Sequence, residues 1–271
     1  MTATPAFRLE RRPLELRFRR AQLTARQWLT PAYVRVRVSG ADLRGFDSPG
    51  ADDHLRLFFP DAPPASLEEL RAAPSREYTP LAWDAEEGWL DIEFALHGAE
   101  NGADNGADGG DNGVAAAWAR DAEPGAAIGV GGPRGSMVLT GRPDGWLLAG
   151  DETAVPAMRR FAHLMDADAV GRILVETSDE AHELPISAPP GVIVEQVHRG
   201  GTAAGVALAH RLDALGAADR PAGDVFGFVA AEQGIVRPGR ALLVERWGLP
   251  ADRIVVKGYW KRGESEYHAP H

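Results

Sequence analysis

A short stretch near the middle of the chain constrains the fold more than any other. Residues 146–149 are apolar, Gly150-Asp151-Glu152-Thr153 follows, and the residues up to about 165 have a helical composition. The pattern predicts a strand, a tight turn and a helix, with Asp151 or Thr153 as the cap of the helix. The N–H groups of such a turn point beyond the strand end, and Gly150 would let a ligand approach the backbone. The stretch therefore predicts an α/β domain whose strand end suits a phosphate group.

The residues after about 141 alternate between strand and helix patterns. Strands are expected at residues 146–149, 172–176, 191–197, 224–230 and 253–257, and helices at residues 153–165, 203–215 and 238–247. This alternation predicts a Rossmann-like, mostly parallel sheet covered by helices. We place the domain boundary in the Gly- and Pro-containing segment after residue 141, which gives domains at 1–141 and 142–271.

The first half is strand-like throughout. Apolar and charged residues alternate at 14–19, 33–38, 54–59 and 90–96, and two shorter candidate strands lie at 126–130 and 137–139. Several short strands separated by Gly and Pro predict a closed β-sheet. We expect an antiparallel six-stranded barrel.

Composition excludes several classes of function. The 271-residue chain has a net charge of −10, which argues against general nucleic-acid binding, and it has no cysteine, which excludes thiolate chemistry and Cys-ligated iron–sulfur clusters. An electron-transfer reaction would need an organic cofactor. Because no apolar run approaches the roughly 20 residues that span a bilayer and no secretory signal begins the chain, we expect a cytoplasmic protein without membrane insertion. A monomer is the working expectation.

Two motifs accompany the central turn. Arg76-Glu77-Tyr78-Thr79-Pro80 precedes it, and Gly258-Tyr259-Trp260-Lys261-Arg262-Gly263 lies near the C-terminus. With further matches such as Leu29-Thr30-Pro31, Asp53-His54-Leu55-Arg56 and Gly132-Pro133-Arg134-Gly135, the set resembles the siderophore-interacting proteins. These are flavin-dependent ferric-siderophore reductases built on the ferredoxin-NADP reductase plan. The resemblance extends from about residue 14 to residue 263.

The resemblance implies an FAD site in the first domain. It assigns Arg76 to the flavin phosphates and Tyr78 and Thr79 to the flavin ring and ribityl chain, with Glu77 in the same motif; a barrel-edge ion pair is the alternative for this segment. The backbone amides of a second segment, at Val114, Ala115, Ala116 and Trp118, would hold the diphosphate after His97-Gly98. In the family Pro and Ser stand where this chain has Val114 and Ala116, so one hydroxyl contact is lost. For His97 a position at the barrel rim and a cofactor contact are equally open.

The resemblance also implies a site for NADH or NADPH in the second domain. Gly150, Asp151, Glu152 and Thr153 would hold the diphosphate of the nucleotide, and Glu232 would follow a later strand, where Ala231 replaces the glycine of the family. An acidic run at residues 176–180 suits the free ribose hydroxyls of NADH and would repel the extra phosphate of NADPH. A solvated loop is the alternative for that run.

Two Gly-rich segments have simpler interpretations. Residues 98–113 contain two copies of Asn-Gly-Ala-Asp, which we interpret as a mobile, dispensable insertion; a calcium site is the alternative, and no metal site is expected. Residues 129–135 fail as a dinucleotide fingerprint, because Arg134 replaces the third glycine and a strand pattern follows. That segment is interpreted as a turn that presents Arg134.

A ferric siderophore is often anionic, so an acidic protein needs a basic entrance to receive it. The resemblance supplies candidate substrate-binding residues at Arg56, Arg134, Tyr259, Trp260, Lys261 and Arg262, with surface ion pairs as the alternative for the cations. We expect NAD(P)H-dependent, FAD-mediated reduction of ferric siderophores, which releases Fe(II) in the cytoplasm. Two other functions stay open, namely a flavin reductase or diaphorase with another acceptor, and a degenerate, non-enzymatic siderophore-binding homologue.

Overall fold

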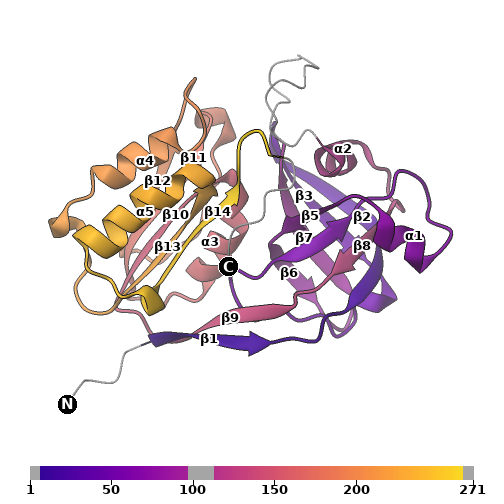
Figure 1. Cartoon of the computed structure of the whole chain (residues 1–271), viewed down its shortest axis with the longest axis horizontal. Helices are drawn as coiled ribbons and strands as arrows, with labels where there is room; N and C mark the ends of the chain where they lie inside the picture. Colours follow the sequence, from indigo (N-terminus) through magenta and orange to yellow (C-terminus); the bar gives the residue numbers. More distant parts are fainter. Residues whose placement is uncertain (1–6, 97–112, 265–271) are drawn as a thin grey trace. The chain divides into compact units, whose positions relative to one another are not determined.

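The computed structural model describes residues 7–96 and 113–264 (Figure 1). The described residues form two compact units, one within 11–138 and one from 139–264 together with 7–10. Strands β1 (Phe7–Pro13) and β9 (Gly135–Gly141) pair in a two-stranded ribbon that divides between the units. The first residues belong with the second unit because Phe7 packs edge-on against Phe226, at 6.0 Å between ring centroids.

The first unit is a curled antiparallel sheet of seven strands (Figure 1). The order is β5-β4-β8-β2-β3-β7-β6. The strands are β2 (Phe18–Thr30), β3 (Tyr33–Ser39), β4 (Leu55–Phe58), β5 (Ser75–Tyr78), β6 (Pro80–Asp84), β7 (Trp89–Ala95) and β8 (Ala127–Gly131). The predicted fold class is confirmed, although the expectation was six strands. Strands β5 and β6, at opposite edges of the sheet, were not predicted, and the predicted strand at residues 137–139 lies in β9 of the ribbon instead.

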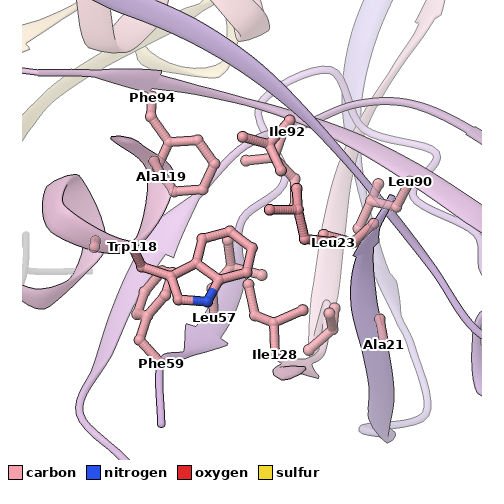
Figure 2. Packing of buried hydrophobic residues seen from close by; sticks show 14 of the residues in the cluster. Ala21, Leu23, Leu57, Phe59, Leu90, Ile92, Phe94, Trp118, Ala119 and Ile128 are labelled. Atoms are coloured by element: carbon pink, nitrogen blue, oxygen red, sulfur yellow. The ribbon is translucent and has the colours of Figure 1, made fainter. Parts of the chain in front are cut away.

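The core of this unit follows the alternation in its strands. Val34, Val36 and Val38 of β3 are fully buried, whereas the arginines between them are partly exposed. Helix α2 (Val114–Asp121) adds Trp118 and Ala119 to the same core (Figure 2). The short helix α1 (Leu67–Ala72) begins at Ser66, whose hydroxyl accepts the Glu69 N–H at 3.1 Å.

The second unit contains a five-stranded parallel sheet in the order β12-β11-β10-β13-β14. Its strands are β10 (Gly145–Asp151), β11 (Val170–Thr177), β12 (Val192–His198), β13 (Val225–Glu232) and β14 (Ile254–Trp260). Its helices are α3 (Val155–His163), α4 (Val206–Asp213) and α5 (Val236–Arg240), and a π-helical segment at Ala241–Arg246 extends α5. All five strands and all three helices lie where the sequence predicts them.

Side-chain alternation on β10 and β13 places helices on both faces of the parallel sheet. Leu147 packs with residues of α4 and of the segment after α5, whereas Phe226 and Phe228 pack against Phe161 of α3, with ring centroids at 5.0 Å in both pairs. The chain leaves β10 for β11 on one side and later returns to β13 on the other. In sheets with this order, ligands bind at the carboxyl ends of the strands beside the central strand.

Over the described parts of the chain, no helix has the length and apolar character that crossing a membrane requires.

Candidate functional site

Strand β5 carries the residues that the resemblance assigns to the flavin. It is an edge strand bonded to β4, with Leu55 opposite Tyr78 and Leu57 opposite Arg76. Because residues directly opposite in an antiparallel pair share a face, Arg76 and Tyr78 lie on the face of the fully buried Leu55 and Leu57. Thr79 is buried between β5 and β6. The structure therefore brings Arg76, Tyr78 and Thr79 together at the inner edge of the curled sheet.

Arg56 and Glu77 lie on the outer face of the same strand pair. They are directly opposite one another, and Nη2 of Arg56 is 3.2 Å from Oε1 of Glu77. Both side chains are 41% exposed, so solvent weakens this ion pair. Glu77 was predicted to contact the cofactor and Arg56 the substrate. Both roles stay predictions, and both contacts would be made from the outer face of the sheet.

An aromatic cluster joins β5 to helix α2. The ring of Tyr78 lies 4.4 Å from that of Phe94, and Trp118 lies 5.6 Å from Phe59 and 6.3 Å from Phe94. Figure 2 shows Trp118 with Phe59 and Phe94 in the core of the unit. Since Trp118 is only 8% exposed, its side chain anchors α2 to the sheet, and a cofactor contact from Trp118 stays a prediction.

The second predicted flavin segment forms the first turn of α2, a helix that the sequence analysis did not anticipate. Val114, Ala115 and Ala116 follow the N-cap residue Gly113, which has no side chain to cap the helix, and no acidic residue lies in the first turn. Ala115 and Ala116 are buried, so the backbone rather than the side chains is available to a ligand. His97 lies outside the described residues, as does most of the predicted insertion at 98–113.

Helix α2 contacts β5, so a helix start with glycine as its N-cap residue and the Arg76–Tyr78 strand belong to one region. A helix start binds phosphate through its N–H groups, an arginine adds a cation, and an aromatic ring offers a surface for a flat ring system. The residues present therefore fit FAD.

Asp151 organises the carboxyl edge of the parallel sheet. Its fully buried carboxylate accepts hydrogen bonds from the Thr153 N–H at 3.0 Å and the Thr153 hydroxyl at 2.5 Å. Its other oxygen accepts from the Glu232 N–H at 3.0 Å and from Trp260 Nε1 at 2.8 Å. One side chain thus joins the ends of β10, β13 and β14.

The chain's own carboxylates occupy three turns and helix starts at this edge. Asp151 caps the 3₁₀ turn Glu152–Ala154 before α3, and Glu232 caps the turn Gln233–Ile235 before α5 by accepting the Gly234 N–H at 2.6 Å. Glu176 of β11 accepts the N–H groups of Gly205 at 2.6 Å and Leu208 at 2.9 Å at the start of α4. The turn at Gly150–Thr153 was expected to hold a diphosphate; that role stays a prediction, and a phosphate there would meet Asp151.

Gly150 is required by packing. A Cβ atom at this position would lie 2.5 Å from the Cβ of Ala154 and 2.6 Å from the carbonyl oxygen of Ala230. The explanation from sequence was an open approach for a ligand. The structure instead explains this glycine by the close contact between the turn and β13.

The acidic run after β11 is largely used within the fold. Burial raises the pKa of Glu176, against the opposing effect of the two backbone N–H groups that it accepts. Asp179 caps a 3₁₀ turn through the Ala181 N–H at 2.9 Å and lies 2.7 Å from Nδ1 of His182, which lowers the pKa of Asp179. The expected contact of this run with a ribose therefore has fewer candidate carboxylates than the sequence indicated.

Glu152 forms a buried ion pair that the sequence analysis missed. Its Oε1 lies 2.5 Å from Nη1 of Arg199, and the two side chains are 10% and 15% exposed. Arg199 directly follows β12, so it lies at the same edge of the sheet as Glu152. A signal in the sequence is Arg199-Gly200-Gly201 at the end of a predicted strand.

The C-terminal motif ends strand β14. Trp260 donates to Asp151, and Tyr259 packs edge-on against Phe228 at 6.4 Å. Lys261 is hydrogen-bonded to Glu264, and the Arg262 N–H lies 3.4 Å from Oε1 of Glu232. These contacts attach the motif to the α/β unit, and its predicted role in substrate binding stays a prediction.

Arg134 is exposed in a turn after the cis Gly132–Pro133 bond, as expected for a residue presented to solvent. Arg56 and Arg134 belong to one compact unit, and Lys261 and Arg262 belong to the other. The four cations therefore lie in two different units, and their joint role in substrate binding stays a prediction. Within the described residues no cluster of three or more His, Asp or Glu side chains is arranged to hold a metal ion.

Two protein-family models match the chain. Residues 22–137 match the siderophore-interacting FAD-binding domain, and residues 143–263 match the siderophore-interacting protein model. The matched ranges follow the curled sheet and the parallel sheet in order.

Curated relatives match over nearly the full length. The NADPH-dependent ferric-chelate reductase of Escherichia coli is 30% identical over 261 residues, which cover 91% of this chain and 94% of the relative. The ferric vibriobactin reductase ViuB of Vibrio cholerae is 29% identical over 257 residues, with 90% of each protein covered.

Solved structures give the same result. A siderophore utilization protein from T. fusca superposes with a TM-score of 0.80 at 31% identity and covers 97% of this chain and 98% of its own. The ferredoxin reductase of carbazole 1,9a-dioxygenase, at 14% identity and a TM-score of 0.63, shares the fold over 91% of this chain and 68% of its own. The predicted family and fold are confirmed, and at the level of the family so are the oxidoreductase class and FAD as cofactor. The chain belongs to the siderophore-interacting protein family.

Proposed function

We propose that this protein is an NAD(P)H-dependent flavoprotein that reduces ferric siderophores and releases Fe(II) in the cytoplasm. Two relatives of nearly equal length are named as ferric reductases, and one of them is named as NADPH-dependent. The absence of cysteine excludes Cys-ligated iron–sulfur clusters, and an organic cofactor such as FAD needs none.

One observation supports the proposal most strongly. Helix α2 begins at the N-cap residue Gly113, which offers no capping side chain of its own, and contacts the strand that carries Arg76 and Tyr78. A helix start, a cation and an aromatic side chain in one region are what a flavin with a diphosphate requires.

The side chains of the first unit have separate tasks in this proposal. The N–H groups of the first turn of α2 and the guanidinium of Arg76 bind the diphosphate, and Tyr78 with Thr79 contacts the ring system. Trp118 holds α2 against Phe59 and Phe94, which fixes the direction of those N–H groups. When bound, FAD supplies hydride acceptance from the nicotinamide and single-electron donation to ferric iron, chemistry that amino-acid side chains lack.

The second unit binds the nicotinamide nucleotide at the carboxyl edge of its sheet. Asp151 fixes the positions of Thr153, Glu232 and Trp260 there, because it accepts a hydrogen bond from each. The anionic ferric chelate is attracted by the cations at Arg56, Arg134, Lys261 and Arg262. Once the iron is reduced, the chelate binds the metal less tightly.

Steady-state kinetics with purified protein test the proposal. Several ferric siderophores are offered with NADH or with NADPH, and Fe(II) is followed with a ferrous-specific chromogenic chelator. We expect Fe(II) to form only when the nucleotide and the FAD-loaded protein are both present. A colourless protein that takes up no added FAD, or an FAD-loaded protein that reduces quinones but no ferric siderophore, would contradict the proposal.

A further inference from the structure

Arg199 lies among three buried carboxylates at the carboxyl edge of the parallel sheet. It forms an ion pair with Glu152, and Asp151 and Glu176 are close enough to act on its charge. Burial opposes the charged form, yet the carboxylates together raise the pKa of Arg199. The guanidinium is therefore a permanent cation at the edge where sheets of this order bind nucleotides.

The backbone N–H groups that usually bind a phosphate at such an edge are already hydrogen-bonded in this protein. Asp151, Glu176 and Glu232 already accept the N–H groups at the turns and helix starts before α3, α4 and α5. A phosphate would have to displace a carboxylate at each of them. A cation with unused donors is the remaining partner of suitable charge.

Arg199 has such donors. Within the described residues its side chain makes one hydrogen bond, from Nη1 to Glu152 at 2.5 Å, which leaves Nε and Nη2 without a bond to the protein. A guanidinium held at one end keeps its fork in a fixed plane, which favours bidentate binding of phosphate.

The loop that carries Arg199 is ordered and open on one side. The N–H groups of Arg199 and Gly200 donate to the carbonyl oxygens of Thr177 and Ser178, each at 2.9 Å, and the Thr202 hydroxyl donates to the Arg199 carbonyl at 2.7 Å. A Cβ atom placed on Gly200 or on Gly201 would meet no atom within 4 Å. The loop therefore leaves space over its two glycines, and the Arg199 side chain itself is 15% exposed.

We propose that Arg199 binds a phosphate group of the nicotinamide nucleotide, an assignment that rests on the proposed function. The phosphate belongs either to the diphosphate that NADH and NADPH share or to the 2′-phosphate of NADPH. Both phosphate groups are anionic, and their oxygens can accept hydrogen bonds from the free side of the guanidinium in the same way.

The test removes Arg199 without leaving a buried charge. Oε2 of Glu152 is buried with no donor, so the single change Arg199→Gln would strand this carboxylate and could unfold the unit. We therefore compare Glu152→Gln with the double variant Glu152→Gln, Arg199→Gln, both as FAD-loaded protein. The double change Glu195→Gln, Arg211→Gln is the matched control, because it removes another Arg–Glu pair of the same unit, which joins α4 to β12 through hydrogen bonds of 2.6 and 2.9 Å.

Calorimetric dissociation constants for NADP⁺, NAD⁺, 2′-AMP and 5′-AMP provide the readout. Losing a charge-assisted phosphate contact should weaken NADP⁺ binding about 10- to 100-fold relative to Glu152→Gln. A loss confined to NADP⁺ and 2′-AMP assigns the 2′-phosphate, whereas an equal loss for NAD⁺ and NADP⁺ assigns the diphosphate. The control variant should bind all four ligands as the unchanged protein does.

Two results would overturn the proposal, and they are distinguishable. If the double variant binds NADP⁺ and NAD⁺ within about twofold of Glu152→Gln, while the unchanged protein binds and oxidises the nucleotide, Arg199 is not a phosphate ligand and the proposed function stands. If the unchanged, FAD-loaded protein binds neither nucleotide, the proposed function falls together with this assignment.

Discussion

Replacing Asp151 by Ala should destabilise the α/β unit strongly, because one carboxylate accepts hydrogen bonds from elements far apart in the sequence. The donors are the Thr153 N–H and hydroxyl, the Glu232 N–H and Trp260 Nε1, at 2.5–3.0 Å. The carboxylate itself is fully buried, so water does not satisfy these donors in the folded protein.

The magnitude follows from the donors that lose their acceptor. The Thr153 hydroxyl can rotate to another partner, which leaves the N–H groups of Thr153 and Glu232 and the indole N–H of Trp260. Each costs about 1–3 kcal/mol when it is left without a partner. Since these donors are only partly buried, water entering the vacated space recovers part of the loss, and we expect a net destabilisation of about 3–4 kcal/mol.

Hydrogen exchange measured by mass spectrometry is the suitable assay, because a chain of two units need not unfold in one step. Peptides that contain the ends of β10, β13 and β14 should all exchange faster in Asp151→Ala, with opening free energies lowered by a similar amount. Trp260→Phe removes one donor and should cost about 1 kcal/mol. Because the two residues share a bond, the double variant should cost less than the sum of the single changes.

The reasoning is refuted if Asp151→Ala lowers the opening free energy by less than about 1 kcal/mol, or if its effect and that of Trp260→Phe are additive. Asp121 serves as the control, because it pairs with Arg120 on the surface, and Asp121→Ala should leave the α/β peptides unchanged.

Three further predictions concern other parts of the molecule. Trp118→Ala should cost about 3–5 kcal/mol and lower the FAD content, because α2 loses its anchor, whereas the exposed Trp28→Ala should do neither; a stable, FAD-loaded Trp118→Ala protein contradicts this. Burial raises the pKa of Glu176 above 4.5, so the stability that this carboxyl contributes is present below about pH 4.5 and is lost as the pH rises through its folded value. The stability of the unchanged protein relative to Glu176→Gln should therefore fall with rising pH in urea titrations, and a rise is the opposing result. Arg134→Glu should raise KM for an anionic ferric siderophore but not for a neutral quinone, and high salt should reproduce the effect; an unchanged KM in both cases removes Arg134 from the docking site.

Local pattern was sufficient for most of the fold. Alternation at residues 33–38 predicted β3, and the strand–turn–helix pattern around Gly150 predicted the central strand of the parallel sheet. Helix α2 was missed although its four alanines favour a helix, because the segment was interpreted only through its resemblance to the diphosphate-binding segment of the family. Burial of Trp118 against Phe59 and Phe94 stabilises the helix, and such tertiary contacts are not visible in local sequence.

The candidate sites were predicted less completely, because their geometry depends on pairing between distant residues. The motif around Arg76 named four neighbours, but the register of β4 with β5 places Glu77 on the opposite face from Arg76 and Tyr78. The partners of Asp151 lie 81 and 109 residues away, at Glu232 and Trp260, so its role as an internal acceptor could not be derived from spacing. Arg199 matched no motif, and its importance follows from the carboxylates that surround it.

The most direct test of the central claim is anaerobic rapid mixing of FAD-loaded protein, first with NADPH or NADH and then with a ferric siderophore. The account predicts that the nucleotide bleaches the flavin absorbance and that the ferric siderophore restores it while about two Fe(II) form per flavin, because a hydride carries two electrons and ferric iron accepts one. A flavin that the nucleotide does not bleach, or a bleached flavin that the ferric siderophore leaves reduced, would contradict the claim.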